Sequence, residues 1–236
     1  PMPAERVRAL QELARSSPNW DKKDAPALQQ RHDLMRAKLY GFIDRPDAVL
    51  RRFQASDNSL PARYARAIAS YRFANSTGAL GQIDALIQAN PQNPYFHELK
   101  GQALLEAGKP AEAVAPLRRA VQLAPNPSLI QIMLAQALIA SNAHGEEAVT
   151  LLETALRREP ESPEAYAQLA MAYGRKGDLA HADLSSAQAA FMRGELQTAR
   201  QLAARAKTRF PVGSPGWVKA DDIATYRAPG QAGQRN

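Results

Sequence analysis

The segment PYFHELKGQALLEAGKPAEAVAPLRRAVQLAPNP, residues 94–127, decides the fold. It reads as two helices joined by a tight turn. Gly108 can end the first helix in the left-handed conformation, and Pro110 can begin the second, where a proline loses no hydrogen bond. Gly101 places a small residue where two antiparallel helices must approach each other closely. We expect Pro125 to end the second helix, because a proline interrupts the helical hydrogen bonds.

Four prolines repeat this unit along the middle of the chain. They are Pro91, Pro125, Pro160 and Pro211, at intervals of 34, 35 and 51 residues. A period near 34 residues, with small residues at fixed offsets, is typical of tetratricopeptide repeats. The sequence therefore predicts an all-α chain: a tetratricopeptide-like helix-turn-helix solenoid, wound as a right-handed superhelix and preceded by N-terminal helices outside the repeat pattern.

The long last interval predicts a helix that two units share. The helix over residues 179–192 would be the second helix of one unit and the first of the next, since each solenoid helix packs on both neighbours. The expected organisation is an N-terminal helical segment at 1–58, a solenoid of four to five units at 59–211, a capping helix at 212–227 and a disordered tail at 228–236.

Composition excludes several classes of site. The chain contains no cysteine, which excludes disulfides and thiolate metal ligands. Its net charge is +7, but basic and aromatic residues do not interleave along one face, so we expect no nucleic-acid partner. No apolar run approaches the roughly 18 residues of a membrane span, so no transmembrane segment is expected.

The four histidines are not spaced like metal ligands. His97-Glu98 begins like the HExxH zinc-protease motif, but the position four residues after His97 holds Gly101 instead of a second histidine. The other three, His32, His144 and His181, share no helical spacing with one another. Nucleophile-elbow and phosphate-loop motifs are absent as well. We therefore expect no catalytic residue, metal or cofactor in this chain.

The expected binding surface is the inner face of the solenoid, lined by the first helices of the units. Candidate peptide- or partner-binding residues are Tyr95, Glu98, Gln102 and Glu106 in one unit, Ile132, Gln136 and Ile139 in the next, and Met171 and Arg175 in the third. Glutamate and glutamine side chains match a peptide carboxylate poorly, whereas a mixed apolar and amide surface suits an extended or unfolded polypeptide. The alternative for each position is an ordinary solvent-facing side chain.

Five strings, distributed over residues 3–226, carry a more specific resemblance. They are Pro3-Ala4-Glu5-Arg6-Val7, residues 36–42, residues 93–102, Arg193-Gly194-Glu195-Leu196, and Ser214-Pro215-Gly216-Trp217 with Asp221-Asp222-Ile223. This ordered set resembles the region that follows the catalytic domain in BepA-like bacterial zinc metalloproteases. The resemblance implies that the chain is the C-terminal half of a periplasmic metalloprotease, whose zinc and HExxH helix belong to a missing domain.

The same resemblance implies partners. The chain would recruit misfolded or assembling envelope proteins and would contact its own N-terminal protease domain. None of the family's catalytic residues has a counterpart here, so none can be assigned. The chain opens Pro1-Met2-Pro3 without an initiator methionine, and we therefore expect it to be cut from a longer protein. The alternative is a free-standing scaffold or adaptor with no attached enzyme.

Overall fold

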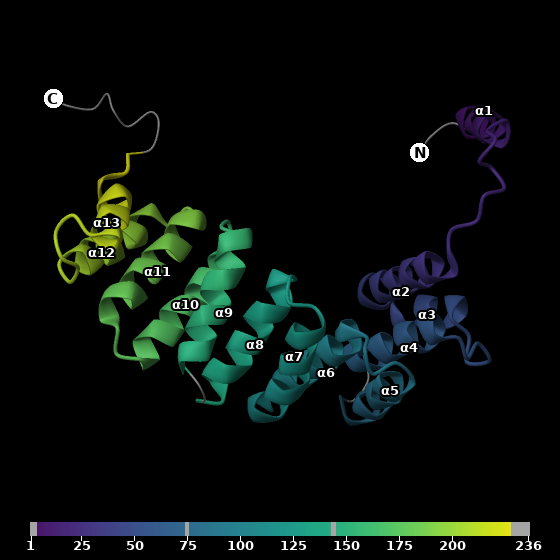
Figure 1. The fold of residues 1–236 in the computed structure, drawn as a ribbon, viewed down its shortest axis with the longest axis horizontal. Helices are drawn as coiled ribbons and strands as arrows, with labels where there is room; N and C mark the ends of the chain where they lie inside the picture. Colours follow the sequence, from purple (N-terminus) through teal and green to yellow (C-terminus); the bar gives the residue numbers. More distant parts are fainter. Residues whose placement is uncertain (1–3, 74–75, 143–144, 228–236) are drawn as a thin grey trace. The chain divides into compact units, whose positions relative to one another are not determined.

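The structure, a computed structural model, describes residues 4–73, 76–142 and 145–227. These residues form thirteen α-helices and no strand, which confirms the predicted all-α class. No helix in the described ranges has the length and apolar character needed to cross a membrane. The chain divides into two compact units, residues 1–73 and residues 74–236 (Figure 1).

The first unit is built on the pairing of two helices. Its helices are α1 (Ala4–Arg15), α2 (Pro26–Ile43), α3 (Pro46–Arg52) and α4 (Leu60–Phe73). α2 packs against α4, and a Cβ added to Gly41 would lie 2.8 Å from the Cβ of Ile68, so only glycine fits there. Arg66 in α4 donates hydrogen bonds of 2.6–3.3 Å to three carbonyl oxygens of residues 53–57, which holds the loop after α3.

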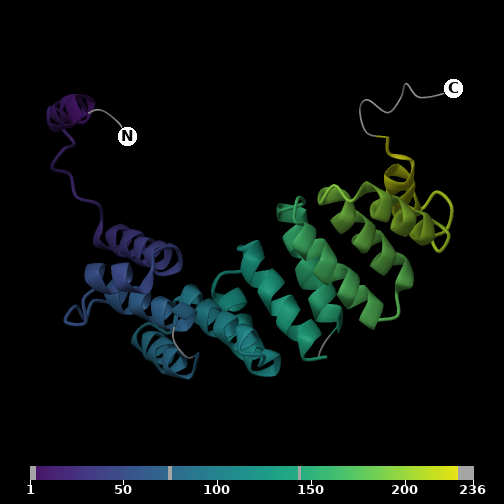
Figure 2. The same ribbon diagram turned by 180° about the vertical axis from the view of Figure 1, so that it is seen from behind.

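The second unit is a row of helices in which each packs on the next. They are α5 (Ser76–Ala89), α6 (Pro94–Glu106), α7 (Pro110–Leu123), α8 (Ser128–Ala140), α9 (Gly145–Arg158), α10 (Pro163–Arg175), α11 (Leu179–Met192), α12 (Leu196–Lys207) and α13 (Pro215–Thr225). A continuous core of leucine, isoleucine and alanine side chains runs from α6 to α10. Figure 2 shows this row from the opposite side, in blue through teal and green to yellow.

The helix ends follow the predicted turn chemistry. Gly108 has a φ of +73°, and the N–H of Lys109 donates to the carbonyl of Leu104 at 2.9 Å, the pattern of a glycine-ended helix. Pro110 begins α7 as predicted. At the end of α8 the left-handed residue is Asn142, with a φ of +57°. Ala143 and His144, which follow Asn142 in the chain, lie outside the described residues.

Contacts between alternate helices confirm the shared helix. α6 contacts α8 and α8 contacts α10, but the next contact of this kind joins α11 to α13. The first-helix layer therefore changes from the even-numbered to the odd-numbered helices at α11. This helix is the second helix of the unit that α10 begins and the first helix of the unit that α12 completes.

The limits of the predicted domains are not tested by these contacts. The compact division falls after Phe73 and assigns α4 to the first unit, whereas the sequence pattern placed residues 59–73 with the repeats. Compact units are defined by how closely residues pack, whereas the predicted boundary follows the repeat pattern. The division after Phe73 therefore does not test the predicted boundary after residue 58, which stays a prediction. The predicted tail at 228–236 lies outside the described residues.

Candidate functional site

The first helices of three successive repeats have equal length. α6, α8 and α10 each contain thirteen residues, so equivalent positions can be compared directly. The second position holds Tyr95, Leu129 and Glu164, the ninth holds Gln102, Gln136 and Met171, and the thirteenth holds Glu106, Ala140 and Arg175. Residues two, nine and thirteen of one helix lie on one side of it, because seven residues are nearly two full turns.

These three helices form the inner layer of the stack. α6 contacts α8 and α8 contacts α10, whereas the second helices α7 and α9 show no comparable contact in the described part of the chain. In a curved stack the inner layer is the more crowded one. The uncovered sides of α6, α8 and α10 therefore share the concave face of this part of the second unit.

Large apolar side chains are uncovered on this face. Tyr95 is 45% exposed, Leu129 59% and Met171 50%. Gln136 and Glu106 are also exposed, while Gln102 and Ile132 are half-buried. The sequence prediction omitted Leu129. The repeat period could have identified Leu129 as a candidate, because this residue lies 34 residues, one period, after Tyr95.

Two of the nine predicted binding residues are buried. Glu98 is 5% exposed and Ile139 is 3% exposed, so neither side chain can contact a ligand directly. They occupy the fifth and twelfth positions of their helices. The solvent-exposed side of each first helix is narrower than the sequence predicts. Neighbouring helices bury the residues at both edges of that side.

Arg175 has a structural role. Its guanidinium donates to the carbonyl oxygen of Ile139 and, at 3.1 Å, to Oδ1 of Asn142. These bonds satisfy the C-terminal end of α8, where a positive charge is also favoured by the helix dipole. The neighbouring Lys176 pairs with Glu146 at 3.2 Å. The charge of Arg175 is thus engaged by the chain itself, which makes a peptide carboxylate a poor ligand there.

A tetratricopeptide repeat family model matches residues 63–126 and 132–182. Both of these stretches carry tetratricopeptide repeats. The matched ranges include all of α6 and α10 and the part of α8 from Ile132 onward. The predicted tetratricopeptide-like solenoid is confirmed.

Solved structures show the same fold at low sequence identity. The structure of YrrB, described as a TPR protein with an unusual peptide-binding site, is 16% identical with a TM-score of 0.59, over 83% of this chain and 95% of that one. A MamA fragment from Desulfovibrio magneticus RS-1 is 18% identical with a TM-score of 0.57, over 72% and 93%. No curated protein matches the sequence. These likenesses establish the fold of the repeats and do not bear on a protease connection.

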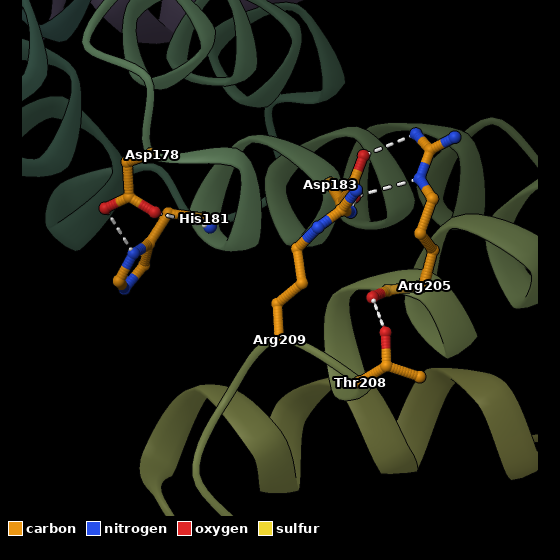
Figure 3. Close-up of polar contacts among 6 residues, drawn as sticks. All are labelled: Asp178, His181, Asp183, Arg205, Thr208 and Arg209. Atoms are coloured by element: carbon orange, nitrogen blue, oxygen red, sulfur yellow. Dashed lines mark hydrogen bonds and ion pairs between the residues drawn. The ribbon is translucent and has the colours of Figure 1, made fainter.

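A polar cluster lies where the repeat register changes (Figure 3). Asp183 in α11 is 8% exposed, and its carboxylate pairs with both Arg205 and Arg209. The Nε of Arg205 donates to it at 2.9 Å. The three groups link α11 to α12 and to the residues after it, so the cluster stabilises the shared helix.

The same region holds a histidine in an aromatic setting. The ring of His181 stacks on Tyr173 and meets Phe210 edge-on, both at 4.9 Å between centroids. Asp178 accepts from the backbone N–H of His181 at 3.1 Å and contacts its ring Nδ1 at 2.8 Å. Burial raises the pKa of Tyr173, and its hydrogen bond to the carboxylate of Glu153 raises it further.

Within the described ranges no group of three or more histidine, aspartate or glutamate side chains could hold a metal ion. Asp183 pairs with two guanidinium groups, and His181 contacts Asp178 through its ring Nδ1. His97, the start of the partial HExxH pattern, contacts the carbonyl oxygen of Pro91 at 2.9 Å. His144 lies outside the described residues.

Proposed function

We propose that the solenoid binds an extended polypeptide segment on an inner strip, defined as Tyr95, Gln102, Leu129, Gln136 and Met171. The exposed apolar side chains of three consecutive first helices carry this proposal. A chain that folds alone covers most such side chains, and a row of them along a concave surface is typical of a protein-binding groove. YrrB, which has the same fold, is described by its peptide-binding site.

The spacing of the strip suits an extended ligand. Packed helices lie about 8–10 Å apart. A polyproline II segment rises about 3.1 Å per residue and returns to the same side every third residue, a repeat of about 9 Å. Every third side chain of such a peptide would therefore meet the next inner helix. Each of these side chains would make an apolar contact with Tyr95, Leu129 or Met171. The side-chain amides of Gln102 and Gln136 lie beside these contacts.

Charge defines the ligand further. The strip itself contains no charged residue, and Arg175 at its edge is held by Ile139 and Asn142. The exposed charged groups nearby are Glu106 and Glu164. The favoured ligand is thus an uncharged stretch with apolar and amide side chains, such as an unfolded segment of another protein, and recognition does not require a free C-terminus.

Peptide binding tests the proposal. An array of overlapping peptides of about twelve residues, probed with the whole chain, should select segments with apolar residues at a spacing of three. Dissociation constants would then be measured by fluorescence anisotropy for the same peptide with a free and an amidated C-terminus. The proposal expects similar affinities for the two forms. Absence of measurable binding, or a strict requirement for the free carboxylate, would contradict it.

In the biological setting we favour a scaffold or adaptor with no attached enzyme. The family match concerns repeats alone, and YrrB, which has the same fold, is described by a peptide-binding site. The second candidate is the substrate-recruiting region of a periplasmic BepA-like zinc metalloprotease, supported by the five resembling strings. The coding sequence upstream of Pro1 separates them. An HExxH helix there favours the protease, and a start codon next to Pro1 favours the scaffold.

A further inference from the structure

The net charge of the chain is concentrated in its first unit. Residues 1–73 contain 14 lysines and arginines against eight aspartates and glutamates, a net charge of +6. Residues 74–236 contain 16 basic and 15 acidic residues. The second unit, which holds the inner strip, is therefore nearly neutral. The basic character of the chain therefore belongs to one compact unit.

α2 in this unit is apolar on two opposite sides. One side carries Ala37 and Gly41, which are buried. The other side carries an outer stripe, defined as Leu28, Met35, Leu39 and Ile43, whose members are 56%, 49%, 49% and 73% exposed. Spacings of seven, four and four residues place these four side chains along one line of the helix. A long apolar stripe left in water is unfavourable and marks an interaction surface.

Basic residues border this stripe. Arg31 and Arg36 are exposed, and at about 100° per residue they fall on its two borders. Neither forms an ion pair with a carboxylate in the described residues. The guanidinium of Arg36 instead lies 5.9 Å from the ring centroid of Tyr40. A stripe of apolar residues between arginines is the pattern of a helix that lies at a membrane surface.

α1 shows the same pattern without any tertiary support. It has no buried residue, and Val7, Leu10 and Leu13 are 38%, 48% and 69% exposed. Val7 and Leu10 lie beside each other on one side of the helix. Trp20, in the turn that follows, is 49% exposed, and tryptophan is enriched at the headgroup level of bilayers. The first unit thus presents an amphipathic α1, the outer stripe of α2 and an exposed tryptophan within 43 residues.

We propose that the outer stripe of α2, together with α1, binds the surface of an anionic lipid bilayer. The net charge of +6 attracts the unit to anionic headgroups, and the apolar side chains enter the boundary between headgroups and acyl chains. The helices lie on the bilayer and do not span it. The inner strip belongs to the other, nearly neutral unit, so membrane binding and peptide binding use different surfaces.

Vesicle cosedimentation with the whole chain tests this proposal. Vesicles of phosphatidylcholine with 30% phosphatidylglycerol should bind at least about tenfold more protein than vesicles of phosphatidylcholine alone, and binding should weaken as salt rises. The double variant Met35→Glu and Leu39→Glu should lose most of this binding. Both side chains are exposed, so circular dichroism and the melting temperature should stay unchanged.

Two further variants keep the result interpretable. Arg31→Glu with Arg36→Glu should also reduce binding, because it removes the charge attraction and leaves the stripe in place. Leu129→Glu with Met171→Glu, in the inner strip, should bind vesicles like the unaltered chain. The proposal is overturned if anionic vesicles are not preferred, or if the stripe variant binds as well as the unaltered chain. Dimerisation that the stripe variant abolishes, without vesicle binding, would overturn it too, since the stripe would then join two copies.

Discussion

Gly101 in α6 lies directly against the side chain of Leu117 in α7. A Cβ added to Gly101 would come within 2.3 Å of Cγ and 2.5 Å of Cδ2 of Leu117, far inside van der Waals contact. Both residues are buried. This contact sets how closely the two helices of the clearest repeat approach, and it explains why the sequence places a glycine inside a helix despite its low helical propensity.

Gly101→Leu should destabilise the second unit strongly. Overpacking usually costs about 1–3 kcal/mol, and this site sits at the upper end because Leu117 is fully buried and cannot move into solvent. Urea unfolding followed by circular dichroism would measure the change. Gly174→Ala in α10 is the control: no atom outside its own helix turn lies within 4 Å, so the better helix former should stabilise by about 0.5–1 kcal/mol. An unchanged midpoint for Gly101→Leu would show that the repeat register is wrong.

Asp183→Asn should weaken the junction between α11 and α12. The amide keeps the shape of the carboxylate but loses its charge-assisted bonds to Arg205 and Arg209. Each such bond contributes about 1.5–3 kcal/mol to the free energy of unfolding. We expect the lower value here, because both arginines are partly exposed and water can hydrate their guanidinium groups once the bonds are lost. Thermal unfolding would report the loss. Asp222→Asn, at an exposed position of α13, should leave the melting temperature nearly unchanged.

Stability should fall at low pH through Asp178. Burial acts to raise its pKa, but hydrogen bonds from the backbone and ring of His181 outweigh burial and hold the pKa below its ordinary value of 3.8. The group therefore contributes stability above pH 4, and this contribution disappears as the pH falls through the folded-state pKa. Between pH 5 and pH 2.5, Asp178→Asn should lose less stability than the unaltered chain. Identical pH profiles would exclude this role.

The capping role of the same residue can be separated from its charge. Asp178 caps α11, since its carboxylate accepts from the N–H of His181. Asn can replace this cap, whereas Asp178→Ala removes it and should cost about 1 kcal/mol at neutral pH. Chemical denaturation of both variants at pH 7 makes the comparison. Equal stability of the Ala and Asn variants would show that the cap contributes nothing measurable.

Leu129→Lys with Met171→Lys should weaken peptide binding at least about tenfold. The two substitutions replace exposed apolar contacts on neighbouring inner helices with charges, and a loss of about 1.4 kcal/mol already corresponds to that factor. Fluorescence anisotropy with a peptide selected on the array would measure it. Leu179→Lys is the matched control, because Leu179 is 53% exposed but lies in α11, outside the inner strip. Equal losses for both variants would mean that the strip is not the binding surface.

The purified chain should show no peptidase activity. Casein incubated with the protein and added zinc should stay intact over hours, since the position where a second HExxH histidine would stand holds Gly101. A fluorescent casein assay with and without a chelator would check this. Cleavage that depends on zinc and copurifies with the chain would contradict the prediction.

The repeat architecture was predictable because it depends on local chemistry. Pro110 is favoured at the start of a helix and Gly108 can end one in the left-handed conformation, so the boundaries of these two helices follow from residue type. The uneven interval before Pro211 likewise predicted the shared helix α11. Candidate site residues were harder to predict. Helical periodicity indicates which side of a helix a residue occupies, but the width of the strip left uncovered depends on two neighbours, which is why Glu98 and Ile139 were included and Leu129 was not.

The sequence by itself determined the all-α class, the period, the turns and the absence of an HExxH motif, because each depends on residues near one another in the chain. The tertiary structure alone decided which side chains remain uncovered, since burial is a property of packed helices. It also decided where charge gathers. The boundary between the two units assigns a net charge of +6 to residues 1–73. The outer stripe of α2 is an exposed surface because α4 packs on the opposite side of that helix.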